Sequence, residues 1–272
     1  MKQNTLAAWL LILSLAPLPL QAEQAADAKT SSLSLVLKET LRLAHEGDPQ
    51  AQYVLGLFYE AGQERTRDIE KAIAWYEKAA AQGYGKAMVN LGAIYHKGKG
   101  VERDPEKARY WYEKAAAKGI AKAQYNLALL YASRPPEERD LQQSFRWFTL
   151  AARQGHAWAQ MNLGIMYAEG YGTERDDGLA VFWEALAAQQ GVEPARKRVE
   201  EYVQRLPRLR IHRTRVNIRI QPDLQAEIID RRNAGDIVYR LGESRDGQWY
   251  EIYLPEGHLI GYVAAFLAEE AD

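Results

Sequence analysis

The sequence of 272 residues contains no cysteine. This absence excludes disulfide bonds, thiolate metal ligands, cysteine nucleophiles and a lipid attached to an N-terminal cysteine. The sequence has no excess of charge of one sign either, because it contains 35 basic and 36 acidic residues and the formal net charge is -1. The composition therefore makes no overall electrostatic case for binding nucleic acid or an anionic membrane. With 47% hydrophobic and 26% charged residues, the chain is typical of folded proteins and is long enough for two domains.

Long hydrophobic runs are scarce, and the most prominent one lies near the N-terminus, from position 6 to about position 20. It follows a lysine, contains two prolines and is shorter than the roughly 20 residues that span a bilayer. The pattern predicts a signal peptide at residues 1–22, cleaved after Ala22 or Ala28, and then a flexible segment at 23–32. The mature protein would be exported, to the bacterial periplasm or beyond it. An uncleaved membrane anchor is the alternative.

Most of the chain repeats itself at a step of 36 residues. The stretch YEKAAAQGY at 76–84 returns as YEKAAAKGI at 112–120. The same step separates four leucines, four tryptophans, four aspartates and four glycines: Leu55, Leu91, Leu127 and Leu163; Trp75, Trp111, Trp147 and Trp183; Asp68, Asp104, Asp140 and Asp176; Gly83, Gly119, Gly155 and Gly191. A step without insertions predicts four in-phase units that stack into a solenoid over residues 33–206, with helical caps on both sides. The units are 51–86, 87–122, 123–158 and 159–194.

Each unit has the pattern of two amphipathic helices. In the second unit, Ala87, Leu91 and Ile94 share one helical face and are expected in the core. Gly92 follows inside that helix, where glycine costs about 1 kcal/mol relative to alanine, so a neighbouring helix is expected to approach closely there. Gly56 and Gly164 repeat this choice.

The second helix of the unit carries start and stop signals. Asp104 and Pro105 are expected as its N-cap and first helical residue. Trp111 is expected as a large buried side chain beside small alanines. Gly119 is expected to end the helix in a left-handed conformation.

The combined pattern, A-x-x-x-L-G-x-x-Y, then G-x-G, then D-x-x-x-A-x-x-W-[YF]-x-x-A-A-x-x-G, resembles the Sel1-like repeat family, a relative of tetratricopeptide repeats. The resemblance covers about residues 40–205. It implies a right-handed superhelix of helix pairs that holds other proteins together, usually without catalysis.

The first helix of each repeat has one stripe of residues that belongs neither to the face expected in the core nor to the face that carries the glycine. Asparagine recurs there and offers both a donor and an acceptor to an extended peptide. Trp158 stands where the other units have Gln or Lys, and an exposed tryptophan is a favoured interface anchor. The candidate partner-binding groove consists of Lys86, Asn90, Lys122, Asn126, Trp158 and Asn162. The alternative is that these positions are merely solvated or follow the family consensus.

The periodicity changes after Pro207. Short runs of β-branched and aromatic residues, separated by turn signals such as NAGD and RDGQ, predict a small all-β barrel over residues 207–272. The order V-N-I-R, then IVYRLGE, D-G-x-W-Y-E-I, G-Y-V and F-L resembles the bacterial SH3-like domain over about residues 212–268. That resemblance implies binding of peptidoglycan or its peptides, or a role as an interaction module. The sequence departs from the family at Tyr262, where Trp is usual.

The candidate cleft of the barrel consists of Tyr239, Trp249, Tyr250 and Tyr262, whose rings suit a peptide or sugar face. Trp249 and Tyr250 are adjacent on one strand and point to opposite faces, so at least one of them belongs to the core. Packing of the barrel alone is therefore the alternative for these aromatic residues.

Nothing in the sequence points to catalysis. The five histidines lie in unlike positions without partners at metal-ligand spacing, so neither a metal nor a cofactor is expected. The chain has no phosphate-binding glycine loop, no G-x-S-x-G motif and no S-x-x-K motif. We therefore expect a multidomain α plus β protein, an exported noncatalytic adaptor for envelope proteins whose barrel is a candidate for binding peptidoglycan. The alternatives are a regulator or inhibitor of a cell-wall hydrolase and a secreted factor that acts on a host cell.

Overall fold

The computed structural model describes residues 37–62, 67–133 and 139–271. The expected signal peptide at 1–22 and the segment 23–32 lie outside this range. In the described part of the chain, no helix combines the length and the apolar character that crossing a membrane requires. The chain divides into two compact units, residues 1–103 and 104–272, and each is considered by itself.

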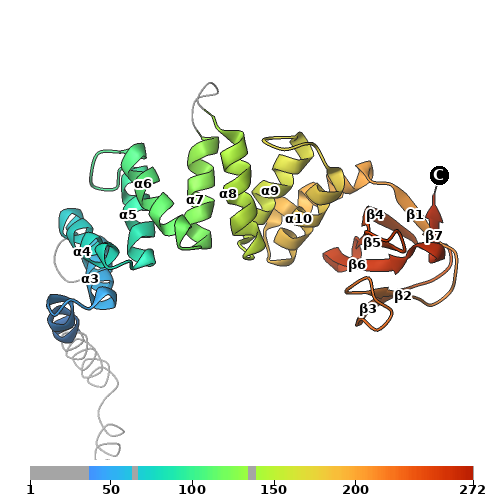
Figure 1. The fold of residues 1–272 in the computed structure, drawn as a ribbon, viewed down its shortest axis with the longest axis horizontal. Helices are drawn as coiled ribbons and strands as arrows, with labels where there is room; N and C mark the ends of the chain where they lie inside the picture. Colours follow the sequence, from blue (N-terminus) through green and yellow to red (C-terminus); the bar gives the residue numbers. More distant parts are fainter. Residues whose placement is uncertain (1–36, 63–66, 134–138, 272) are drawn as a thin grey trace, which may run out of the picture. The chain divides into compact units, whose positions relative to one another are not determined.

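Both units contain the expected helix pairs (Figure 1). In the first unit, a helical segment at 37–45 precedes α3 (Pro49–Ala61), α4 (Ile69–Ala81) and α5 (Gly85–Lys97). The second unit continues with α6 (Pro105–Ala117), α7 (Ala121–Ala132), α8 (Leu141–Arg153), α9 (Ala157–Glu169), α10 (Asp177–Gln189) and α11 (Glu193–Tyr202). The neighbours α3 and α4, α7 and α8, and α9 and α10 pack against each other. The expected fold of the repeats is confirmed.

The helix signals act as the sequence predicts. Asp104 accepts a hydrogen bond from the backbone N–H of Lys107 at 2.9 Å, and Asp68, Asp140 and Asp176 cap their helices in the same way. Gly119 has φ +79° just after α6, so it ends the helix in the left-handed region that favours glycine.

Aromatic packing in the second helices differs from the expectation. The repeated tryptophans are only half-buried, whereas the next residue, Tyr76, Tyr112 or Phe148, is almost completely buried. A Cβ on Gly56 would lie 2.3 Å from the Tyr76 ring, so the glycine leaves room for this ring. Close approach at Gly56 is therefore confirmed, but the buried aromatic side chain is the tyrosine rather than the tryptophan.

Buried glutamines connect successive helices in three of the repeats. The Gln124 amide donates to the carbonyl of Ala116, and the Gln124 side-chain oxygen accepts from Gln154 at 2.7 Å. The same arrangement recurs at Gln52 with Gln82 and at Gln160 with Gln190. Each buried amide is thereby satisfied at its oxygen and at its nitrogen. Gln52, Gln124 and Gln160 occupy equivalent positions of the 36-residue step, and Met88 replaces the glutamine in the second repeat.

The C-terminal part is an antiparallel β-structure with the strands β1 (Arg208–Ile211), β2 (Val216–Arg219), β3 (Ile228–Arg232), β4 (Ile237–Glu243), β5 (Trp249–Leu254), β6 (Leu259–Ala264) and β7 (Ala268–Glu270). The strand order is β3-β2-β6-β5-β4-β1-β7. Alternate residues such as Leu209, Ile211 and Ile252 fill its core, as the period of two predicts. The expected small barrel is confirmed.

The barrel packs directly on the last repeat. Tyr253 of β5 and Leu206 join Val181 and Ala185 of α10 in one hydrophobic cluster. Gly178 of α10 lies so close to β4 that a Cβ there would be 2.2 Å from the carbonyl oxygen of Leu241. The two domains are thus joined by a shared core and not by a flexible linker alone.

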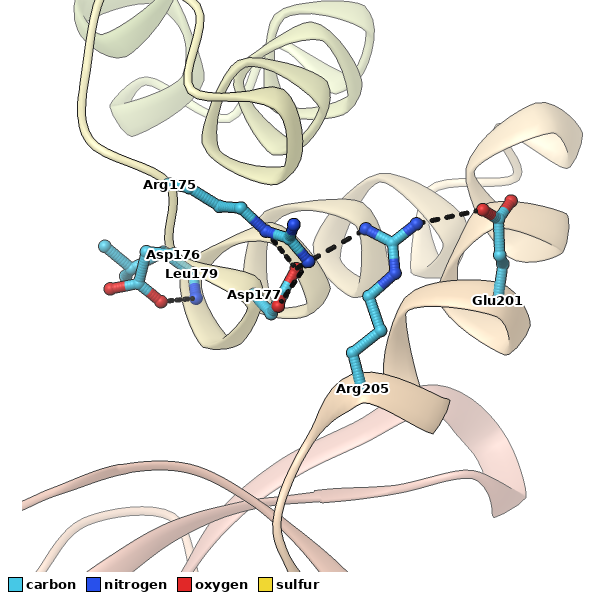
Figure 2. Close-up of polar contacts among 6 residues, drawn as sticks. All are labelled: Arg175, Asp176, Asp177, Leu179, Glu201 and Arg205. Carbon is cyan, nitrogen blue, oxygen red and sulfur yellow. Dashed lines mark hydrogen bonds and ion pairs between the residues drawn. The ribbon is translucent and has the colours of Figure 1, made fainter.

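Ion pairs also lie near the contact between the barrel and the last repeat, at the short helix η2 (Val203–Arg205). Figure 2 shows Asp177 at the start of α10 accepting from Arg175 at 2.9 Å and facing Arg205 at 3.5 Å. Arg205 also reaches Glu201 of α11 at 3.1 Å. Because these groups are largely or partly exposed, each pair contributes little beyond orienting the chain between the domains.

Candidate functional site

A groove of about 610 Å³ opens on the barrel where three separate segments meet. Pro222 and Leu224 come from the loop between β2 and β3, and Trp249 begins β5. Phe266 belongs to the short helix η4 (Ala265–Leu267). Leu224 and Phe266 are each 68% exposed, although both are large apolar residues, while Trp249 is 7% exposed and forms the floor. Exposed apolar side chains around a concave surface are typical of binding sites.

A second hollow of about 460 Å³ continues the groove and shares Pro222 and Asp246 with it. The polar lining of the two hollows consists largely of carboxylates: Asp223, Glu243, Asp246 and Glu251. Arg245 is the single cation among the lining residues. Hydrogen bonds from the Ser244 hydroxyl and the Gln248 N–H lower the pKa of Asp246, so this carboxylate is ionised at neutral pH. The lining therefore suits a ligand with apolar and positively charged groups.

The four aromatic residues expected in the cleft are not brought together. Trp249 and Tyr262 line the first and second hollows. The Tyr262 hydroxyl donates to Glu251 at 2.7 Å, and burial followed by this bond raises the pKa of the phenol. Tyr239 packs against the cluster shared with α10, and Tyr250 packs partly against the barrel core. The expected opposition of Trp249 and Tyr250 across the strand fits this arrangement.

The residues expected to form the partner-binding groove of the solenoid lie in both compact units, residues 1–103 and 104–272. In the first unit, Lys86 is exposed and the Asn90 amide donates to the Tyr76 hydroxyl at 3.1 Å. In the second unit, Asn126 lies near Tyr112 and partly offsets the rise in the pKa of this phenol that burial causes. The Asn162 amide donates to the carbonyl of Trp158 at 2.7 Å. Lys122 is exposed, and Trp158 is 48% exposed. Whether any of them touches a partner stays a prediction.

Sequence reasoning missed two features of the structure. Leu224 and Phe266 show no periodic signal, because their importance comes from loops that meet only in the folded barrel. Glu184 is completely buried and pairs with Arg198 at 2.6 Å. This pair was visible in the sequence, because Glu184 interrupts the aromatic series at 76, 112 and 148.

Among the described residues, no group of three or more His, Asp or Glu side chains is placed to hold a metal ion. The perturbed carboxylates have structural partners: Glu184 is paired with Arg198, and Asp246 closes its own turn.

Comparison with known families identifies the class of protein that these parts define. The model of the Sel1 repeat matches residues 49–84, 85–120, 121–156 and 159–192, which is more than half of the chain, and the model of the bacterial SH3 domain matches 214–268. The chain belongs to the Sel1 repeat family and carries a bacterial SH3 domain. Both expected resemblances are confirmed, and such domains point to a scaffold for protein interactions.

Solved structures agree with this fold. A protective antigen of uropathogenic Escherichia coli, c5321, is 38% identical with a TM-score of 0.60, over 62% of this chain and 36% of that chain. A Sel1 repeat protein from Oxalobacter formigenes is 28% identical with a TM-score of 0.55, over 62% of this chain and 67% of that chain. Chitin synthase regulator SKT5 of Saccharomyces cerevisiae is 55% identical over 40 residues, which are 15% of this chain and only 6% of that protein.

Proposed function

We propose that this protein is an exported, noncatalytic adaptor of the bacterial envelope, whose repeats hold a protein partner and whose SH3 groove binds peptidoglycan peptides. The observation that carries the proposal is the groove itself, with exposed Leu224 and Phe266 above the Trp249 floor. The N-terminal pattern supports export to the periplasm. Scaffold families of this kind are generally noncatalytic, which supports the absence of an enzymatic role.

The carboxylates of the groove refine the ligand. A wall peptide offers apolar side chains to Leu224 and Phe266, and a free amino group on it would be complementary to Asp246 and its acidic neighbours. Such contacts with a short peptide are individually weak. Attachment to the polymeric wall would strengthen them, because many copies of the peptide are close together.

Co-sedimentation with purified cell-wall sacculi tests the proposal. The mature full-length chain is used, because an isolated barrel would expose Tyr253 and the rest of the face that packs on α10. We expect the wild type to pellet, the double variant Leu224→Ser, Phe266→Ser to stay in solution, and Leu150→Ser, an equally simple change at an exposed leucine of α8, to pellet normally. Wild-type protein that stays in solution would refute wall binding. Pelleting of the double variant would refute the groove as the site.

One observation favours the alternative of a regulator. The yeast protein that is 55% identical to this chain over 40 residues is a chitin synthase regulator. A regulator of a cell-wall hydrolase would form a stable one-to-one complex that changes lytic activity and would not need the SH3 groove. A secreted factor acting on host cells would be found outside the bacterium on fractionation.

A further inference from the structure

A pair of side chains 14 residues apart recurs where successive repeats meet. In the first unit, Asn90 donates to the hydroxyl of buried Tyr76. In the second unit, Asn126 lies near the buried Tyr112 and opposes the rise in the phenol pKa that burial causes. In both places a tyrosine hydroxyl lies beside the asparagine amide, and in the first it accepts a hydrogen bond from that amide.

The third pair breaks this rule. Phe148 stands in the place of the tyrosine and has no hydroxyl to accept the amide of Asn162. Asn162 instead donates to the carbonyl of Trp158, one helical turn earlier at the exposed start of α9. Its side-chain oxygen accepts no hydrogen bond from the residues that the structure describes. The amide is therefore available to donate to, and accept from, the backbone of a bound chain.

The Asn162 amide belongs to a region that also contains aromatic side chains. The His156 ring stacks on Tyr125 with centroids 4.5 Å apart, and Trp158, two residues further on, is 48% exposed. Burial lowers the pKa of the His156 imidazole, and the nearby charge of Lys122 adds to this effect. We call Lys122, Tyr125, His156, Trp158 and Asn162 the Trp158 surface.

The charged residues of the two segments that carry the Trp158 surface have one sign. The segments 118–126 and 153–163 contain three basic residues and no carboxylate. Lys118 and Lys122 are exposed and take part in no ion pair within the described part of the chain. This is the opposite of the SH3 groove, where carboxylates predominate, so the two surfaces select different ligands.

We infer that the Trp158 surface binds an extended acidic segment of a partner protein. An apolar side chain of the segment packs on the Trp158 ring, its backbone amide pairs with Asn162, and a carboxylate faces Lys122. The inference rests on the proposed scaffold function and names the chemistry of the protein that the repeats hold. An extended segment fits because Asn162 and Lys122 lie on different helices, α9 and α7, so a ligand must reach across both.

Fluorescence anisotropy with short labelled peptides tests the inference on the mature full-length chain. One N-acetylated, C-amidated peptide alternates Leu and Glu, and a second alternates Leu and Lys. We expect the acidic peptide to bind, the basic peptide to bind at least about tenfold more weakly, and Trp158→Gln to reduce the acidic peptide's affinity by about tenfold. Trp158→Gln introduces the residue that the first repeat has at position 50, so little loss of stability is expected.

Phe148→Tyr tests the role of Asn162 more directly, because it restores the hydroxyl that lies beside the asparagine in the first two repeats. We expect its melting temperature to be unchanged and its affinity for the acidic peptide to fall severalfold. The matched control is Tyr110→Gln, which removes a 50% exposed aromatic ring from α6 and should bind normally.

Three results would overturn the inference: no binding of the acidic peptide, equal binding of the basic peptide, or wild-type affinity in both Trp158→Gln and Phe148→Tyr. Sacculus binding separates this outcome from a failure of the proposed function. Trp158→Gln should still pellet with sacculi if the SH3 groove binds the wall.

Discussion

His156 caps α9 with its imidazole instead of a carboxylate. Its Nδ1 accepts from the backbone N–H of Ala159 at 3.2 Å, which requires that this nitrogen carry no proton. Burial lowers the pKa of His156 below its usual value, so the neutral form is favoured in the folded state. Because the folded pKa is the lower one, this stabilisation is complete above about pH 6.5 and is lost as the pH falls below that value.

We expect His156→Asn to reduce the dependence of stability on pH, because an asparagine cap does not titrate in this range. On going from about pH 7.5 to about pH 5.5, the wild type should lose about 1 kcal/mol more than the variant, the size of one cap. Urea unfolding at the two pH values measures the difference. Part of the loss should persist in the variant, because burial also lowers the pKa of His96 and His258. An identical loss in both proteins would show that the imidazole cap is not titrating.

At the scale of elements, α10 and α11 are joined by a buried ion pair where the first two repeats have a phenol and an amide. Glu184 is 0% exposed, and Arg198 donates to it at 2.6 Å. Glu184 Oε2 and Arg198 Nη2 are buried without partners. Burial raises the pKa of Glu184 to about 7, although the hydrogen bond and charge of Arg198 act in the opposite direction. A Cβ on Gly164 would lie 2.6 Å from Glu184 Cγ, so the carboxylate side chain occupies the space that Tyr76 fills beside Gly56.

Replacing this pair by Glu184→Tyr with Arg198→Asn should make the last repeat resemble the first. The folded pKa of Glu184 lies above its unfolded value, so the wild type should lose stability as the pH rises from about 4.5 to about 7, by up to about 3 kcal/mol. The double variant should lack this slope and be more stable at pH 8, because a tyrosine and asparagine cost less to bury than an incompletely bonded ion pair. Arg198→Asn alone should be less stable at pH 8. Thermal unfolding across this pH range is the measurement, and a double variant less stable than the wild type at pH 8 would contradict the account.

On the scale of the whole molecule, the SH3 domain and the last repeats are joined by the cluster around Val181, Tyr202 and Tyr253. The SH3 groove and the Trp158 surface both belong to this compact second unit. Their separation is therefore set by packing and not by the length of a free linker. A partner on the repeats would be held in a defined geometry relative to the ligand of the groove, which determines whether both sites are engaged at once.

Gly178→Ala should weaken this junction. The added Cβ would meet the carbonyl oxygen of Leu241 at 2.2 Å, so α10 and β4 must separate. We expect a loss of about 1 to 3 kcal/mol and faster tryptic cleavage after Arg205 and Arg208, beside the junction. The control is Gln142→Ala, the exposed equivalent position one repeat earlier, which should change stability by less than about 0.5 kcal/mol. If cleavage of Gly178→Ala is as slow as in the wild type, close packing at this glycine does not hold the domains together.

The sequence alone was enough to predict the helix pairs, their caps, the close approach at Gly56 and Gly164, and the change to β-structure after Pro207. These features repeat at a fixed step or depend on neighbours within a few residues, so they are local. It did not predict that Tyr76 rather than Trp75 is the buried ring, since both are large, apolar and adjacent. Their roles depend on where the preceding helix places its glycine.

Only the tertiary structure decided which surfaces are open. Leu224, Trp249 and Phe266 come from three segments far apart in the sequence, and no periodicity connects them. The exclusion of Tyr239 from the groove follows from the packing of the barrel on α10, a contact between domains that neither domain's pattern encodes. The sequence by itself determined the elements, because local hydrogen bonding and hydrophobic spacing specify them. The binding surfaces were decided by which elements cover one another, since burial depends on neighbours that folding alone brings together.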